Sequence, residues 1–560
     1  MWRGLNNNVS YFSRHRERGV TAYFIAGKKP KISREDGVFL LFFAVMAVFY
    51  GYRMFTVVPW YDELYTYYYF ISRGPVYAAI HWPLPNNHVG YSTLSACLGI
   101  FGSAPIALRG VSYLCSLGSL ILLYRISKKW FDDGLALVPV FLFAGMNMVN
   151  QLAVQGRGYA LVTFCYLAAI LSLHHLIVEK SDNKRNYIAF GLSLVIALWA
   201  IPSSLYMVMP VCLIGGLVLL LDRDFGRLIR LIITSLVSAV CTAGIYCLLW
   251  LAIGSNLITK IEDMPFYQGR HIDVIIHRPF WALTEGMEYM LATPYIQSMT
   301  RQEFNRQAGH WLRTLFGEQL FPIANLGGLL GGGMCFLLVF GLIAAAVCLV
   351  RRPKKAFSEW YFVLTAVLLG AALVIQCKLP YQRVFSFLGV WAALLVGWLL
   401  QRTAVLVQGD LAIRWRVRAA KAVKILMYLA AGLSWAFVLA TGDAPYSMRD
   451  ELLADAYEQT IIEETDTVAV TDCDQEYLLL YLYGIGEERV TRDIRAADIV
   501  VLDKAQLNLP YDYREGPEEW KFYLSAAEVA AQADYMEENM EQIYENWQFV
   551  LLQRKKARTE

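Results

Sequence analysis

The sequence is short of charge and of the motifs that mark several large enzyme classes. Only 17% of its 560 residues are charged, whereas 57% are hydrophobic. It contains no P-loop, no GxSxG and no HExxH motif, which argues against a P-loop nucleotide hydrolase, a serine hydrolase of that type and a zinc peptidase. Its ten cysteines form no CxxC pattern, so neither a zinc ribbon nor a disulfide framework is expected.

What the sequence has instead is a series of long apolar runs. They are rich in Leu, Val, Ala and Gly and recur at about the 20 residues that cross a bilayer. The runs are continuous rather than alternating, which excludes a membrane β-barrel. We therefore expect an all-α polytopic membrane protein with about eleven transmembrane helices. The spans are predicted near 37–57, 105–124, 134–150, 158–174, 187–201, 204–221, 231–253, 323–350, 361–377, 384–401 and 425–441.

Basic residues indicate the orientation of these spans. They precede the first span and recur in alternate loops, for example at Lys128-Lys129 and Arg351-Arg352, and such loops face the cytoplasm. Loops 58–104 and 254–322 and everything after Thr441 are then extracytoplasmic. The segment 1–36 has no short apolar core with a cleavage site and is predicted to stay in the cytoplasm beside anionic lipids. The protein is expected in the plasma (inner) membrane.

The charge changes sign after the last span. From Gly442 to the end there are 11 Lys and Arg against 27 Asp and Glu, whereas the preceding residues have 39 against 20. Residues 467–471, 499–502 and 548–553 are typical of strands, and 477–482 of a helix. Three parts follow: a basic cytoplasmic segment 1–36, a transmembrane domain 37–441, and a small soluble extracytoplasmic α/β domain 442–560.

Two adjacent carboxylates, Asp62 and Glu63, follow the first span directly. They lie among Trp60, Tyr61 and further tyrosines, which are also the residues of an interfacial aromatic belt. Solvated acids in such a belt are one interpretation. The other is a general base for a hydroxyl, beside aromatic faces on which a sugar or an isoprenoid packs. The residues alone leave both open.

Further motifs suggest a family. They are Asp62-Glu63, Asn87-His88, Leu98-Gly-Ile-Phe-Gly102, Ala107-Leu-Arg109, Lys128-Lys-Trp-Phe131 and Gln155-Gly-Arg157-Gly-Tyr159-Ala-Leu161. Together they resemble the C-type glycosyltransferases (GT-C), which use polyprenyl-phosphate sugars, and in particular bacterial relatives of protein O-mannosyltransferases and of the lipid A aminoarabinose transferase. The resemblance covers about residues 37–175 and is only architectural beyond. One departure is that the family often has His-Pro-Pro where Val89-Gly90 follows His88 here.

The resemblance implies the GT-C fold and a function. An inverting hexosyl- or pentosyltransferase would move a sugar from a polyprenyl-phosphate donor to an acceptor outside the membrane. The family's acceptor-activating residue maps onto Asp62, and Glu63 would hold Asp62 or position the acceptor. The residues expected to bind the donor phosphate are Arg157, Lys378 and Arg383. The residues expected to bind substrate are Tyr61, His88 and Tyr159.

Several of these cationic residues could have a purely structural role instead of binding the donor phosphate. Lys378 and Arg383 could snorkel from span ends, and Arg109 could pair with Asp62 or Glu63 or neutralise a helix end. The loop 254–322 is either a lid over substrate or a tether on the bilayer. The triplets Asp222-Arg-Asp224 and Asp472-Cys-Asp474 are interpreted as turns or helix caps rather than nucleotide-sugar sites.

The expected partners are a polyprenyl-phosphate-linked sugar, a lipid, glycan or protein acceptor and membrane lipids, with no nucleic acid. No cofactor is required, because the lipid phosphate is the leaving group. A divalent metal is the less favoured alternative, since the outer histidines, His88 among them, show no ligand spacing. Two other functions remain open: a lipid or sugar transporter or flippase, which would need ionisable residues inside the spans, and a non-catalytic receptor, for which the acidic pair would be dispensable.

Overall fold

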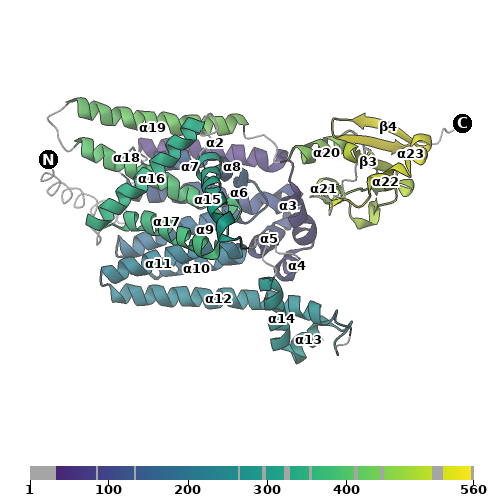
Figure 1. Ribbon diagram of the computed structural model, residues 1–560, viewed down its shortest axis with the longest axis horizontal. Coiled ribbons are helices and arrows are strands. Elements are labelled where there is room, and N and C mark those ends of the chain that lie inside the picture. The colour runs from purple at the N-terminus through teal and green to yellow at the C-terminus, as the bar shows by residue number, and fades with distance from the viewer. Residues whose placement is uncertain are drawn as a thin grey trace, which may run out of the picture.

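The computed structural model describes residues 33–83, 86–131, 134–262, 265–292, 298–320, 328–351, 356–408, 414–441, 447–507 and 521–555. Most of the predicted basic segment 1–36 lies outside them. Figure 1 shows a bundle of long helices with a small α/β part at one end and the α13–α14 pair projecting from one side. The first helix begins at a capping box in which Ser33 Oγ accepts from Asp36 N and the Asp36 carboxylate accepts from Ser33 N.

Every predicted span but one is a single helix. These helices are α2 (Arg34–Thr56), α6 (Ala104–Trp130), α9 (Tyr159–Ile177), α10 (Lys184–Ala200), α11 (Leu205–Leu221), α12 (Phe225–Ile258), α16 (Gly328–Arg351), α17 (Phe357–Gln376), α18 (Leu388–Gln408) and α19 (Arg414–Thr441). Seven helices of the described chain are long and apolar enough to cross a membrane. The predicted class, an all-α polytopic membrane protein with a small C-terminal α/β part, is confirmed.

The exception is the predicted span 134–150, which was wrong as a continuous helix. It is broken into α7 (Leu137–Ala144) and α8 (Asn147–Ala153). The Asn150 amide donates to the carbonyls of Ala144 (2.6 Å) and Met146 (2.7 Å), and so satisfies groups that the break releases. Arg53 in turn donates to Asn150 O at 2.7 Å. Hydropathy could not reveal this break, because the apolar composition continues across it and only specific hydrogen bonds, such as those of Asn150, make it tolerable.

The first outer loop, 58–104, is folded into short helices. They are α3 (Tyr61–Thr66), the π-helix η2 (Tyr67–Ile71), α4 (Pro75–Ile80), α5 (Val89–Cys97) and η3 (Leu98–Phe101). Helix α3 follows α2 after only four residues, so the acidic pair stays at the end of the bundle. This loop therefore forms a fixed platform over the helix ends.

The second long outer loop, 254–322, has two separate parts. Helices α13 (His271–His277) and α14 (Pro279–Ala292) turn back along α12, and the two backbones approach so closely at Gly254 and Gly286 that an added Cβ would lie 1.8 and 2.0 Å from a facing carbonyl oxygen. Helix α15 (Arg301–Arg313) and η5 (Thr314–Gln319) lie elsewhere, where Trp311 Nε1 donates to Pro380 O at 2.7 Å. Closure of this loop over substrate stays a prediction.

The C-terminal part contains a five-stranded sheet of order β2-β1-β3-β5-β4. Its elements are α20 (Met448–Glu458), β1 (Val468–Ala469), α21 (Cys473–Tyr483), η9 (Glu487–Arg489), β2 (Val490–Thr491), η10 (Ile494–Ala496), β3 (Ile499–Asp503), η11 (Lys504–Leu507), α22 (Ala526–Ala530), α23 (Ala533–Asn539), β4 (Met540–Glu545) and β5 (Phe549–Arg554). Strand β1 is parallel to β2 and β3, and β5 is antiparallel to β3 and β4. The three predicted strands and the helix are present. Strands β2 and β4 were missed, because one has two residues and the other is mostly exposed.

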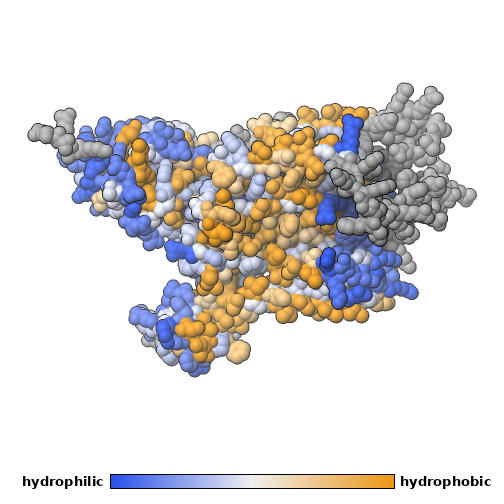
Figure 2. Space-filling view, turned by 180° about the vertical axis from the view of Figure 1, so that it is seen from behind, coloured by the Kyte–Doolittle hydropathy of each residue, from blue (hydrophilic) through white to orange (hydrophobic). Residues whose placement is uncertain are grey.

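Charged residues gather at the two ends of the molecule, and apolar surface lies between them (Figure 2). Ion pairs Lys128–Glu35 (3.1 Å) and Lys129–Glu179 (2.5 Å) join helix ends at the end of the bundle away from the sheet. Figure 2 shows a broad hydrophobic surface over the helices, with hydrophilic residues gathered at the α/β part and at the opposite end. This division is typical of a membrane protein.

The interpretation of the two acidic triplets as caps is confirmed. Asp224 is the N-cap of α12 and accepts from Arg227 N at 3.2 Å. Asp472 is the N-cap of α21 and accepts from Gln475 N at 3.0 Å. Both carboxylates satisfy free amides of a first helical turn.

Candidate active site

The structure brings Asp62 and Arg383 together. Asp62 lies in the first turn of α3, and its carboxylate is 2.9 Å from the guanidinium of Arg383, which belongs to the short helix η8 (Gln382–Phe385). The guanidinium also lies over the rings of Trp60, Tyr159 and Tyr381, at 5.1, 5.9 and 4.9 Å from their centroids. The two charged side chains are 12% and 20% exposed, so a ligand can still reach them.

Glu63 points away from this pair and is fully buried. Its carboxylate accepts from Arg109 Nε (2.8 Å) and Nη2 (3.0 Å) and from the backbone N–H of Gly156 (2.6 Å). A Cβ at Gly156 would lie 2.4 Å from Leu108 Cδ1, so this close approach requires glycine. Among the alternatives for Arg109, the structure shows pairing with Glu63, and Arg109 Nη1 also donates to Val57 O (2.5 Å) at the C-terminal end of α2. These contacts make Glu63 an anchor of α3 on α6.

Arg157 lies beneath the same helix. It is 3% exposed, and Nη1 donates to Thr66 Oγ1 (2.7 Å) while Nη2 donates to Asn86 Oδ1 (2.5 Å). Thr66 lies one turn after Asp62, whose backbone carbonyl is 3.4 Å from Arg157 Nη1. Arg157 therefore adds positive charge to the site from behind α3 and fixes the loop that carries Asn86.

His88 serves as a buried hydrogen-bond acceptor. Its Nδ1 accepts from Gly158 N at 3.0 Å, its Nε2 is 3.2 Å from Arg157 Nη2, and its ring stands edge-on to Tyr159 at 5.1 Å. Burial, with Arg157 and Arg383 nearby, holds the pKa of His88 well below its ordinary value. The imidazole is therefore neutral at physiological pH and holds the connection 154–158 in place.

Two predicted residues lie at the margin of this group. Tyr61 faces the C-terminal α/β part, with Lys521 Nζ 4.8 Å from its ring centroid and the Tyr477 ring at 6.2 Å. Burial raises the pKa of the Tyr61 hydroxyl. Lys378 lies between α17 and η8, and within the described chain none of its contacts reaches Asp62 or Arg157.

Sequence reasoning missed some members of the site. Thr66 could have been found, because it lies four residues after Asp62 on the same helical face. Asn86 and Tyr381 carry no periodic signal, and their roles depend on contacts between distant segments. In the described part of the chain, no group of three or more His, Cys, Asp or Glu residues is arranged to hold a metal ion.

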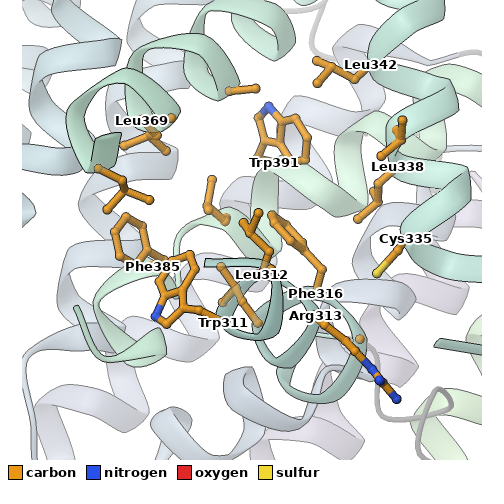
Figure 3. Close-up of a pocket in the computed structure, with 18 of the residues that line it drawn as sticks. Trp311, Leu312, Arg313, Phe316, Cys335, Leu338, Leu342, Leu369, Phe385 and Trp391 are labelled. Atoms are coloured by element: carbon orange, nitrogen blue, oxygen red, sulfur yellow. The ribbon is translucent and has the colours of Figure 1, made fainter. Parts of the chain in front are cut away.

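An apolar cavity of about 1020 Å³ lies beside η8, with Phe385 in its wall. Figure 3 shows side chains of α15, η5, α16, α17 and α18 around it, with Phe385 and Trp311 on one side and Trp391 and Leu338 on the others. Phe385 comes two residues after Arg383 in the same short helix. One connection thus places a cation against Asp62 and an aromatic ring in the cavity wall.

Comparisons with known proteins identify the fold. ArnT from Cupriavidus metallidurans in the apo state is 13% identical, with a TM-score of 0.52 over 93% of this chain and 98% of ArnT. The chain has the fold of the C-type glycosyltransferases. The resemblance seen in the sequence is thereby confirmed for the fold. In addition, residues 89–250 match the family model of dolichyl-phosphate-mannose-protein mannosyltransferases.

Other solved structures are less similar. ArnT from the same organism bound to undecaprenyl phosphate is 13% identical, with a TM-score of 0.49 over 92% of this chain and 98% of that chain. The archaeal oligosaccharyltransferase AglB from Archaeoglobus fulgidus, in complex with an inhibitory peptide and a dolichol-phosphate, is 12% identical, with a TM-score of 0.40 over 83% and 69%. No protein of curated function was found to match the sequence. The family-model match includes Arg109, Arg157 and Tyr159, whereas Asp62 and Arg383 lie outside it.

Proposed function

We propose that this protein is an inverting glycosyltransferase that moves a sugar from a polyprenyl-phosphate donor to an acceptor on the extracytoplasmic face of the membrane. The observation that carries the proposal is η8, which presents Arg383 to Asp62 and Phe385 to the apolar cavity. A ligand with an anionic head and an isoprenoid chain matches both. The family model for residues 89–250 supports it, since that family is named for a dolichyl-phosphate-linked donor.

In the proposed reaction, the Asp62 carboxylate takes the proton of an acceptor hydroxyl or amine. The acceptor atom then bonds to the anomeric carbon of the sugar from the face opposite the phosphate. The bond from that carbon to the phosphate oxygen breaks, and its electron pair leaves with the polyprenyl phosphate. Arg383 is placed to neutralise the departing charge, with Arg157 adding a second positive charge from behind α3. A single displacement inverts the anomeric configuration.

The remaining candidates have secondary roles in this proposal. Glu63 positions Asp62 through Arg109 rather than contacting substrate. Tyr159 lies beside Arg383 and offers a ring face to the donor sugar, whereas Lys378 would join the phosphate only after its loop moves. The reaction needs no metal or other cofactor, because the guanidinium groups stabilise the leaving phosphate.

A transporter would need ionisable groups near the middle of the bilayer. The buried charged residues Arg53 and Glu359 instead lie within three residues of the ends of α2 and α17. Arg109 and Glu63 neutralise each other at the outer end of the bundle. This distribution favours an enzyme whose chemistry takes place at the membrane surface.

The test is Asp62→Asn in the purified full-length protein, with Asp534→Asn as an exposed control. Transfer is followed by mass spectrometry on a total membrane extract of the source cells, which supplies donor and acceptor. Loss of a positioned base should lower the rate by about a hundred- to ten-thousand-fold. Polyprenyl phosphate retained by the purified variant should not decrease. Near-normal transfer by Asp62→Asn would overturn the proposal.

A further inference from the structure

The C-terminal α/β part packs directly on the segment that carries Asp62. Buried residues of α3 and η2 and buried residues of α21 belong to one hydrophobic cluster. Within it the Tyr68 and Tyr477 rings are 4.6 Å apart and the Tyr67 and Tyr481 rings 5.5 Å apart. The part that looked like a separate domain in the sequence thus shares a core with the first outer loop.

Hydrogen bonds reinforce this contact. The Glu476 carboxylate of α21 accepts from Tyr68 OH of η2 at 2.5 Å and from Tyr523 OH at 2.6 Å. Tyr68 also donates to Glu487 at 3.2 Å. Bonds to an ionised carboxylate are about twice as strong as neutral ones, so Glu476 is a strong link between the two segments.

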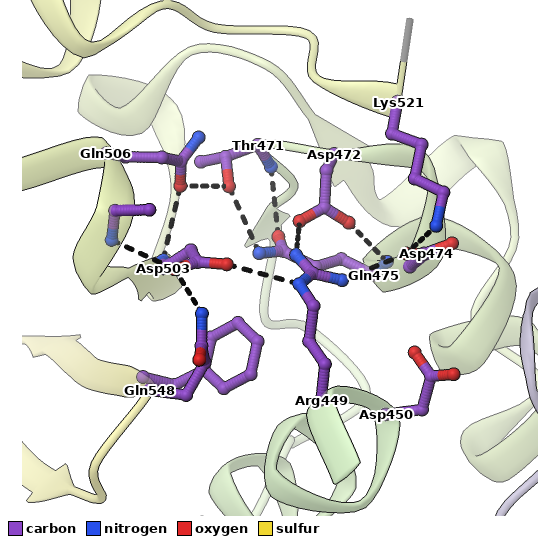
Figure 4. Close-up of polar contacts among 12 residues, drawn as sticks. Arg449, Asp450, Thr471, Asp472, Asp474, Gln475, Asp503, Gln506, Lys521 and Gln548 are labelled. Carbon is purple, nitrogen blue, oxygen red and sulfur yellow. Dashed lines mark hydrogen bonds and ion pairs between the residues drawn. The ribbon is translucent and has the colours of Figure 1, made fainter. Parts of the chain in front are cut away.

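Helix α21 is itself held rigidly inside the α/β part. The Arg449 guanidinium of α20 contacts Asp472, Asp474 and Asp503 at 2.6, 2.9 and 3.1 Å (Figure 4). Asp472 caps α21, and Asp503 ends the central strand β3. A shift of α21 would therefore break a buried charge network as well as apolar contacts.

Helix α3, by contrast, has little stability of its own. It has six residues, its N-cap Trp60 makes no side-chain cap bond, and a π-helix follows it. So short a helix is stable only through tertiary contacts. Its contacts include Glu63 with Arg109, Thr66 with Arg157 and Asp62 with Arg383 on the bundle side, and α21 on the outer side.

We propose that α21, through Glu476, is a positioning element for Asp62, so that the C-terminal α/β part is required for the chemical step rather than for donor binding. This inference rests on the proposed function. A base displaced by about 1 Å loses on the order of a hundredfold in rate, whereas the donor site at Arg383 and the apolar cavity makes no use of α21. Disturbing the α21 contact should thus lower kcat without weakening donor binding.

The experiment compares Glu476→Ala with Asp455→Ala. Asp455 is a matched control: it is also half-buried and accepts two hydrogen bonds, from Tyr544 OH (2.6 Å) and Asn546 Nδ2 (3.4 Å), but both partners lie inside the α/β part. In full-length protein, Glu476→Ala should lower kcat about 10- to 100-fold and should not weaken binding of undecaprenyl phosphate. Asp455→Ala should keep near-normal kcat, and Glu476→Gln should recover part of the loss.

Hydrogen exchange of the peptide 58–71 supplies a readout that needs no substrate. Exchange there should rise in Glu476→Ala and not in Asp455→Ala. The milder pair Tyr68→Phe and Tyr544→Phe replaces the alanine variants if these fold poorly. Equal kcat and equal exchange in the two members of a pair would overturn the inference. If the members of a pair behave equally while Asp62→Asn is inactive in the same assay, the inference about α21 fails and the proposed function stands. An active Asp62→Asn would overturn both the inference and the proposed function.

Discussion

The guanidinium of Arg383 lies 2.9 Å from the carboxylate of Asp62, with Trp60 and Tyr381 against its faces. Arg383, which is assigned to the donor phosphate, is therefore already paired with Asp62, which is assigned to the acceptor proton. A phosphate bound to Arg383 would compete with Asp62 and free it for the acceptor. This relationship favours a sequence in which the donor binds before the acceptor.

The first prediction concerns donor affinity. Arg383→Ala should weaken binding of undecaprenyl phosphate about 10- to 100-fold, since a hydrogen bond to a charged group contributes about 1.5–3 kcal/mol. Arg383→Lys should lose less, because the charge remains and only the forked geometry is lost. Asp62→Asn should bind more tightly than wild type, because Arg383 loses a competing partner. Binding in nanodiscs measures all three, and unchanged affinity throughout would remove Arg383 from the donor site.

The second prediction concerns the buried pair of Glu63 and Arg109, both 0% exposed. Glu63→Ala leaves an uncompensated buried guanidinium and should cost about 3–5 kcal/mol of stability. The double variant Glu63→Leu with Arg109→Met should be more stable than Glu63→Ala alone, because no charge is left buried. Thermal unfolding in detergent compares them. A double variant less stable than the single one would contradict the prediction, and would mean that the bond from Arg109 to Val57 O matters more than the uncompensated charge.

The third prediction concerns pH. Burial, with Asp472 adjacent, raises the pKa of Asp474 to about 7, and burial raises the pKa of Asp450 to about 6, from an ordinary 3.8, although Arg449 and Lys521 oppose both shifts. The folded state then holds protons that the unfolded state releases, so stability falls as pH rises from about 4 to about 7.

Hydrogen exchange of the β1 and β3 amides, corrected for intrinsic rates, should show protection decreasing between pH 5 and 8. Asp474→Asn should flatten that dependence, because the Asn side chain cannot titrate. Asp503 also faces Arg449, and Asp503→Asn serves as the comparison. Protection that increases over this interval in the wild-type protein would contradict the prediction.

The fourth prediction concerns sidedness. Ile461, 83% exposed in the α/β part, replaced by Cys should react with an impermeant maleimide in intact cells or spheroplasts. Lys184→Cys, at the other end of the bundle, should react only after the membrane is broken. The exposed native cysteines Cys97 and Cys241 are changed to Ala in both. The reverse labelling pattern would place Asp62 in the cytoplasm and contradict the proposed reaction.

Local sequence was enough for the helices of the membrane part. Backbone hydrogen bonds are made within each helix, and each apolar side chain lowers the free energy of membrane insertion independently of the others. Composition over about 20 residues therefore determines a span. The same holds for β3 and β5, whose apolar residues are buried. The family motifs were local as well and pointed to Asp62 and Arg157 before their surroundings were known.

Contacts between distant segments decided the rest. Nothing near Asp62 in the sequence indicates Arg383, and nothing near Arg109 selects Glu63 rather than Asp62 as its partner. The docking of α21 on α3 is of the same kind. A buried charge or carbonyl must be satisfied by whichever group the fold brings within about 3 Å, and that group is set by packing rather than by position in the chain. The sequence by itself determined the membrane helices and the candidate residues, whereas only the tertiary structure decided which carboxylate faces the site and which one anchors it.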